Sequence, residues 1–156
     1  MKKTYLLSLF VLVLLLSGCG SQYSAEKLYW HANQASKELA KGRPLDKLDS
    51  QDYDKIISGY RRLVERFPLE SVSAQSQFII TQIYVLRKQY PKAEEELVRV
   101  IQNFSNNAEL ASQAQFMIGN LYERQGKQKK AIQEYEKVSD LFPLSRIGLK
   151  MPVYIA

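Results

Sequence analysis

The chain is short, helix-rich in composition and mildly basic. Its 156 residues leave room for one compact domain or a few copies of a small repeat, which excludes a multi-domain enzyme. The apolar fraction of 46% and the charged fraction of 24% are typical of globular proteins. Only 7 Gly and 5 Pro are present, which favours an all-α fold. The formal net charge of +6, to which Lys2 and Lys3 contribute, is too small to predict nucleic-acid binding.

The first eighteen residues have the pattern of a cleaved secretory signal. Lys2 and Lys3 precede an apolar run from Leu6 to Leu16, which only Ser8 interrupts. This run is about half of the ~20 residues that a membrane-spanning helix needs, so we expect cleavage rather than a permanent span. Residues 16–19, Leu-Ser-Gly-Cys, resemble a bacterial lipobox, in which the Cys is acylated and becomes the first mature residue.

Cys19 is therefore the expected lipid attachment site. It is the only Cys, so an exported chain has no internal disulfide to form and a free thiol would be a liability. The lipoprotein resemblance implies two or three acyl chains, enough for firm anchoring, with residues 19–24 as lipidated Cys and polar tether. Gly20 stands where enterobacterial-type sorting uses Asp to retain lipoproteins in the inner membrane. The expected location is the outer membrane, facing the periplasm, in a Gram-negative cell, and otherwise the cell-surface membrane. The alternative to lipid attachment is that Cys19 is an incidental thiol after ordinary signal cleavage.

Residues 25–143 contain a repeated pattern with an offset of 38 residues. Ten identities connect residues 75–104 with their partners, where average residue usage predicts about two. Gln75, Gln77 and Phe78, for example, return as Gln113, Gln115 and Phe116. A weaker copy, which includes Tyr60, Leu63 and Phe67, lies 37 residues upstream of the middle unit.

Each unit predicts two antiparallel helices. The first unit predicts a helix over 25–41 and, after a long linker 42–52, a second helix ended by Pro68. The middle unit predicts helices over 72–87 and 91–104. The last unit predicts a helix capped by Asn107 and stopped by Gly126, and another over 131–142 before Pro143. Ala93 and Ala131 are expected where paired helices approach closely. Residues 144–156 are expected to be an incomplete fourth repeat or a cap that leaves an apolar edge.

The last unit resembles a tetratricopeptide repeat. Gly119, Tyr122, Ala131, Tyr135 and Pro143 have its spacing, and the resemblance implies an α-solenoid of about three helix pairs that binds other proteins. The middle unit keeps Tyr84, Ala93 and Leu97 but has Thr81 at the Gly position and Ser105 at the Pro position, so looser packing is expected there. The first unit keeps only Tyr60 and Pro68, with Ile56 at the small-residue position.

The repeat length narrows the resemblance further. Units of 37 to 38 residues that close in Arg66-Phe67-Pro68 and Leu141-Phe142-Pro143 are similar to the envelope lipoproteins that include the barrel-assembly factor BamD. This resemblance implies a lipid-anchored scaffold that takes part in assembling outer-membrane β-barrel proteins. A pilotin or an adaptor for peptidoglycan enzymes is the alternative.

The sequence contains few residues in patterns that indicate catalysis or metal binding. His31 is the only His, so triads, Cys/His dyads and multi-His metal sites lack their parts, and no Gly-rich phosphate loop is present. We therefore expect no catalytic residue, metal or cofactor, and an enzyme is the least favoured class. The run Glu94–Glu96 is expected at a solvated helix start. Lys127, Lys129 and Lys130 are expected in a solvated turn, with contact to lipid headgroups as the alternative.

Two surfaces are candidate binding sites for envelope proteins or their peptide segments. One is a face that the tetratricopeptide resemblance places in a concave groove: Gln75, Phe78, Gln82, Gln113, Phe116 and Asn120. The alternative is that Phe78 and Phe116 pack against neighbouring helices. The second surface is centred on Trp30, which lies off the apolar stripe of the first helix, Leu28, Ala32, Ala35 and Leu39. Trp30 is a candidate for N-terminal docking unless the linker 42–52 covers it.

Overall fold

The structure is a computed structural model that describes the backbone of residues 2–155 and the side chains of residues 20–154. In this range it is all-α, with two short 3-10 helices and no strand. The elements are α1 (Lys2–Ala40), η1 (Leu45–Lys47), α2 (Ser50–Arg66), α3 (Ser71–Leu86), α4 (Tyr90–Asn103), α5 (Ala108–Arg124), α6 (Gln128–Leu141), η2 (Gly148–Lys150) and α7 (Met151–Ile155).

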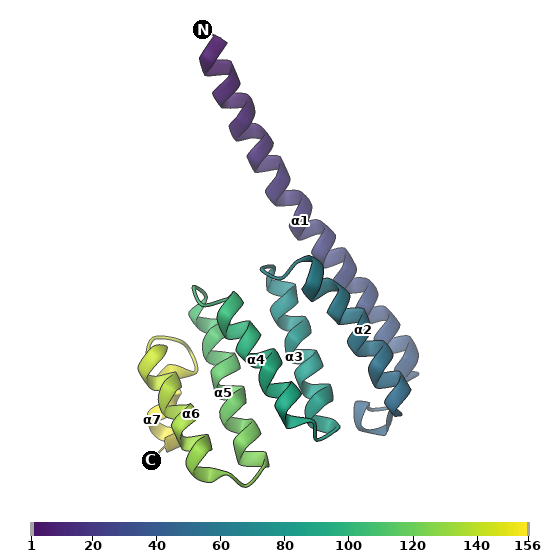
Figure 1. Ribbon diagram of the computed structural model, residues 1–156, viewed down its shortest axis with the longest axis vertical. Coiled ribbons are helices and arrows are strands. Elements are labelled where there is room, and N and C mark those ends of the chain that lie inside the picture. The colour runs from purple at the N-terminus through teal and green to yellow at the C-terminus, as the bar shows by residue number, and fades with distance from the viewer. Residues whose placement is uncertain (1, 156) are drawn as a thin grey trace.

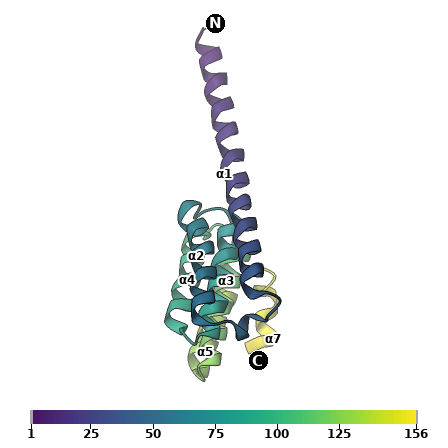
Figure 2. The same ribbon diagram turned by 90° about the vertical axis from the view of Figure 1, so that its right-hand side faces the viewer.

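The helices form a tetratricopeptide-like solenoid of three antiparallel pairs, which confirms the predicted fold class. Figure 1 shows α2 to α6 side by side, with α1 along one edge and α7 beside α6 at the other. The view turned by 90° places α2 and α4 in one layer and α1 and α3 in the other (Figure 2). Side chains between the layers form the core, including Leu63, Ile80, Leu97, Val100 and Val138.

The helix ends follow the local sequence. The side chains of Asp49 and Asn107 cap α2 and α5 by accepting hydrogen bonds from the backbone N–H groups of Asp52 and Leu110. The helices α3 and α5 end in the same left-handed turn, with Lys88 at φ 56° and Gly126 at φ 72°. Glycine adopts this conformation without strain, whereas lysine adopts it at a cost.

Small residues bring the paired helices together in the last unit. Ala93 and Ala131 are almost completely buried, as predicted. A Cβ atom added to Gly119 would lie 2.2 Å from Cε1 of Tyr135, so only glycine fits between α5 and this ring. In the middle unit, Thr81 and Leu97 stand at the positions of Gly119 and Tyr135, and both are 0% exposed. The smaller Leu side chain leaves room for the larger Thr.

The first helix pair has the same aromatic and hydrogen-bond contacts as the last pair, although the sequence pattern does not reveal this. The hydroxyl of Tyr60 donates to Oδ1 of Asn33 at 2.6 Å, as the hydroxyl of Tyr135 donates to Oδ1 of Asn120 at 2.7 Å. Four residues before each Asn, an aromatic ring contacts the same Tyr, at 6.1 Å between centroids for Tyr29 and 5.3 Å for Phe116. Ala32 therefore takes the place of Gly119, which makes α1 the first helix of a full unit.

A buried ion pair connects the first and middle units. Glu96, 2% exposed on α4, accepts from Nη2 of Arg61 on α2 at 2.7 Å and from Nη1 of Arg99 at 3.1 Å. In the last unit the equivalent Glu134 accepts from Gln115 at 2.6 Å and from Lys137. In the middle unit both arginines bind Oε1 of Glu96, and Oε2 of Glu96 has no hydrogen-bond partner. The amide of the buried Gln77, the equivalent of Gln115, has none either.

The helix α1 differs from its prediction. It is continuous through residues 20–24, which were expected to be a tether, and Ser21 donates to Oε1 of Glu70 at 2.9 Å. Ala25 and Ala32 are buried, but Ala35 of the expected stripe is exposed. The reason is that α2 and α3 cover α1 on the side of Ala25 and Tyr29. The side chain of Cys19 lies outside the described residues.

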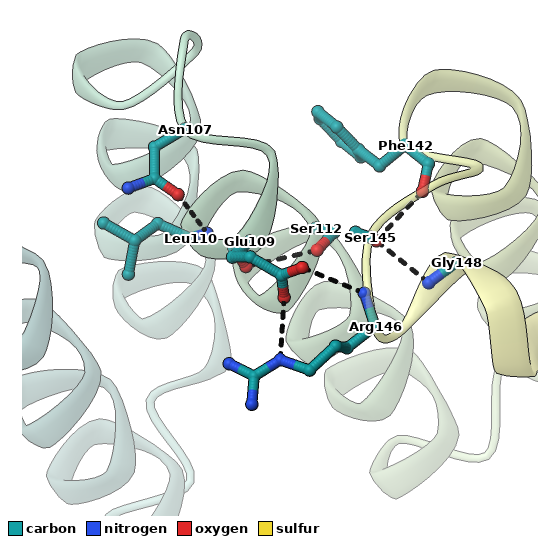
Figure 3. Close-up of polar contacts among 8 residues, drawn as sticks. All are labelled: Asn107, Glu109, Leu110, Ser112, Phe142, Ser145, Arg146 and Gly148. Carbon is teal, nitrogen blue, oxygen red and sulfur yellow. Dashed lines mark hydrogen bonds and ion pairs between the residues drawn. The ribbon is translucent and has the colours of Figure 1, made fainter.

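The C-terminal segment packs on the last pair, as the sequence predicts. Met151 is 1% exposed and contacts the cluster of Ala131, Tyr135 and Val138. The turn that leads to it is tied to α5, because the backbone N–H and Nε of Arg146 both donate to the carboxylate of Glu109 (Figure 3). Several large apolar side chains of this region remain exposed: Leu141, Leu144, Leu149, Val153 and Tyr154.

Candidate functional site

The main candidate site is a groove of about 840 Å³ between α3 and α5. Its walls are the C-terminal halves of these two helices, and η1 and the start of α6 complete the rim. The lining residues are Leu45, Thr81, Gln82, Val85, Leu86, Met117, Asn120, Leu121, Glu123, Arg124 and Gln128. The groove thus combines apolar side chains with amides, a composition that suits an extended peptide.

Only part of the predicted groove face lies in this groove. Gln82 and Asn120 line it, whereas Gln75 and Gln113 are exposed on the preceding turns of α3 and α5. Phe78 does not face a ligand: it is 8% exposed and packs into the cluster formed by α3, α4 and α5. This corrects its assignment to the groove.

Phe116 is likewise not available as predicted. Its ring is half-buried and contacts Tyr135 at 5.3 Å and Tyr154 at 5.4 Å between centroids, because the C-terminal segment folds over it. The apolar area of the groove comes instead from Val85, Leu86 and Met117. Leu86 shares a helix face with Gln82, as its spacing of four residues predicts from the sequence.

The hydrogen-bonding groups of the groove are held in place from behind. The hydroxyl of Tyr135 lies 2.7 Å from Oδ1 of Asn120 and 3.1 Å from Oε2 of Glu123. Burial, followed by the hydrogen bond to Glu123, raises the pKa of Tyr135, so the hydroxyl stays a neutral donor at physiological pH. The amide N–H groups of Asn120 remain as donors for a ligand, and Gln82 is exposed.

Trp30 lies on a second surface, the outer edge of α1. It is 56% exposed, so the linker 42–52 does not cover it, and its ring contacts that of His31 at 5.0 Å between centroids. When Asn33 is aligned with its equivalent Asn120, Trp30 takes the position of Met117. Met117 packs against the core cluster of α3 to α5, whereas Trp30 is exposed. A cavity of about 700 Å³ between α1 and α2 adjoins this surface.

We expect iodide to quench the fluorescence of Trp30, the only Trp, strongly in the isolated protein. Exposure of the ring to solvent is the physical reason, and neutral acrylamide serves as a control for the attraction of iodide to nearby lysines. Loss of quenching on addition of a partner would support N-terminal docking. A ring shielded in the isolated protein would contradict the exposed position.

The two ends of the solenoid differ in charge. At one end, residues 87–92 carry three basic and no acidic residues, and residues 123–130 carry four basic and one acidic. At the other end, segments 67–71 and 104–109 each carry one acidic and no basic residue, and segment 142–150 carries two basic and no acidic residues. Figure 1 shows the N-terminal half of α1 projecting past this second end, where Ser21 contacts Glu70. Lys127, Lys129 and Lys130 thus lie at the end away from Cys19, which argues against headgroup contact by an anchored chain.

The described residues hold few other groups suited to chemistry. No group of three or more His, Cys, Asp or Glu side chains in this part of the chain is placed to bind a metal ion. In the same part of the chain, no helix is long and apolar enough to span a bilayer.

Comparison with known families agrees with the helix-pair geometry. Residues 113–145, from the second turn of α5 to the residues after α6, match the tetratricopeptide repeat family. The chain contains a tetratricopeptide repeat. Such repeats are generally non-catalytic modules that bind other proteins or peptides, and the repeat here places the groove on its first helix. Comparison with curated proteins finds no match.

Proposed function

We propose that this protein is a lipid-anchored scaffold that binds segments of other envelope proteins in the groove between α3 and α5. The observation that carries the proposal is the groove itself, which places the amide groups of Gln82 and Asn120 beside exposed apolar side chains on a tetratricopeptide framework. Amides bind the backbone of an extended chain, and the apolar side chains bind its residues. The proposed function is binding alone and involves no chemical reaction.

The proposed setting is the assembly of outer-membrane β-barrel proteins, in the manner of BamD. Its support is the sequence of the leader, Leu-Ser-Gly-Cys with Gly20 after it, and the 37 to 38 residue repeats. Anchoring at Cys19 would place the end of the solenoid that contains Glu70 toward the membrane, since Ser21 contacts Glu70. The groove would then open toward the periplasm.

Affinity purification of the tagged protein from detergent-solubilised membranes tests this setting. Recovery of the large barrel-assembly protein, lost when Leu86 is replaced by Ser, is the expected result. Leu86 is 42% exposed in the groove, so this change leaves the core intact. Recovery of a secretin or of a cell-wall hydrolase instead would replace barrel assembly with a pilotin or an adaptor role.

A separate prediction concerns the anchor. If the signal is exchanged for one that is cleaved before residue 19, a Cys19→Ser protein should appear in the soluble periplasmic fraction. The reason is that acyl chains on Cys19 are the proposed source of membrane affinity, at ~0.8 kcal/mol per buried methylene. The same exchange with Cys19 kept in a lipobox serves as the control. Retention of the processed Ser protein in membranes after a high-salt wash would contradict the anchor.

A further inference from the structure

The groove opens at the basic end of the solenoid. Leu86 and Arg124 are the last residues of α3 and α5, and Gln128 is the first residue of α6; all three line the groove. The turns beside this opening and the first residues of α4 and α6 carry Lys88, Lys92, Lys127, Lys129 and Lys130. A ligand that extends out of the groove at this end therefore passes among these turns.

The positive charge at this opening is largely unneutralised. Of the basic residues in the two turns, Arg87 is paired with Asp54, whereas Arg124 and the five lysines form no ion pair with a described carboxylate. Two of the acidic side chains at this end bind tyrosine hydroxyls: Glu94 accepts from Tyr122 at 2.9 Å, and Glu123 lies 3.1 Å from the hydroxyl of Tyr135. At the opposite end, by contrast, Glu109 is paired with Arg146.

Several of these ammonium groups are held close to the protein surface. Lys127 and Lys130 lie 5.8 Å and 5.5 Å from the ring centroid of Tyr122, and Lys92 lies 5.7 Å from that of Tyr84. Such contacts restrict long side chains that would otherwise be extended into solvent. These charges are therefore partly ordered at this end of the solenoid before a ligand binds, which reduces the entropic cost of binding.

We propose that the segment bound in the groove is acidic, with apolar side chains that enter the groove and carboxylates that meet the lysines of the turns at 87–92 and 123–130. This inference rests on the proposed function of the groove and specifies its ligand class. A protein segment is favoured over a lipid surface because Ser21, close to the proposed anchor, lies at the opposite end of the solenoid.

Binding of labelled peptides to the full chain in a neutral detergent tests the proposal by fluorescence anisotropy. The probes are a short peptide with two leucines flanked by glutamates and a twin with glutamines in place of the glutamates. We expect the acidic peptide to bind about tenfold more tightly at ~0.05 M salt, and the difference to shrink at ~0.5 M salt. The triple variant Lys127→Glu, Lys129→Glu, Lys130→Glu should abolish the preference without weakening the glutamine twin.

A matched control reverses three basic residues elsewhere, Lys27→Glu, Lys55→Glu and Arg62→Glu, all exposed and all without an ion pair to a described carboxylate. The preference should survive in this control. Equal binding of both peptides, or a preference that survives the Lys127 triple variant, overturns the acidic ligand while leaving the groove intact. Failure of Leu86→Ser to weaken the glutamine twin counts against the groove itself. Binding to phosphatidylglycerol vesicles that depends on Lys127, Lys129 and Lys130, without an acidic-peptide preference, overturns the proposal in favour of a lipid surface.

Discussion

Gly119→Ala should destabilise the protein by about 2 to 3 kcal/mol, which lowers the melting temperature by roughly 10 °C. The new methyl group would lie 2.2 Å from Cε1 and 2.5 Å from Cδ1 of Tyr135. That ring has little freedom to move, because it is 4% exposed, its hydroxyl is hydrogen-bonded to Asn120, and the ring of Phe116 packs against it. The clash therefore outweighs the gain in helix propensity of up to ~1 kcal/mol.

Gly59→Ala is the matched control for this prediction. Gly59 is also inside a helix, but its added Cβ would meet only Cβ of Ala32 at an ordinary 3.8 Å. This substitution should therefore stabilise the protein by about 0.5 to 1 kcal/mol. The double variant Gly119→Ala, Tyr135→Leu, which imitates the middle unit, should recover part of the loss. Unchanged thermal unfolding of Gly119→Ala alone would contradict the close approach of α5 and α6.

Arg61→Met should cost about 3 kcal/mol of unfolding free energy. It removes the guanidinium that lies 2.7 Å from Oε1 of Glu96 and leaves a carboxylate that is 2% exposed. Burial by itself would lower the pKa of Arg61, but the hydrogen bond and charge of Glu96 raise it, so the guanidinium keeps its charge. Loss of Arg61 leaves the buried carboxylate with only the exposed Arg99 as an ion-pair partner.

Two further variants separate the buried pair from ordinary surface charge. Arg99 also contacts Glu96 but is 48% exposed, so Arg99→Met should cost less than about 1 kcal/mol. In the double variant Arg61→Met, Glu96→Leu, both charges are gone, and most of the stability should return. Urea denaturation measures all three. An Arg61→Met protein no less stable than Arg99→Met would contradict the stranding of Glu96.

The sequence predicted the second and third helix pairs well because their repeats have equal length. A constant offset aligns Gln77 with Gln115 and Ala93 with Ala131, and the structure places each pair equivalently. The first pair was also expected, but its equivalence to the last pair is not visible in the sequence. Asn33 and Tyr60 are 27 residues apart, whereas Asn120 and Tyr135 are 15 apart, since the linker 42–52 adds length between the helices. No single offset can reveal both.

The candidate site was harder to predict than the fold. Helical periodicity gives the direction in which a side chain points from its own helix, but it does not predict which other element packs over that side chain. Phe78 and Phe116 share the predicted face with Gln82 and Asn120, yet α4 and α5 enclose the first ring, and Tyr154 covers the second. Similarly, the separation of charge between the two ends depends on which turns lie together, which only the three-dimensional arrangement shows.

Site-specific photo-crosslinking in living cells tests the central claim, that the groove between α3 and α5 binds protein segments, most directly. A photoreactive amino acid at Gln82 is compared with one at Gln102, an exposed glutamine on the outer face of α4. We expect a discrete protein adduct from position 82, lost in a Leu86→Ser background, and none from position 102. Equal adducts from both positions, or an adduct from 102 alone, would contradict it.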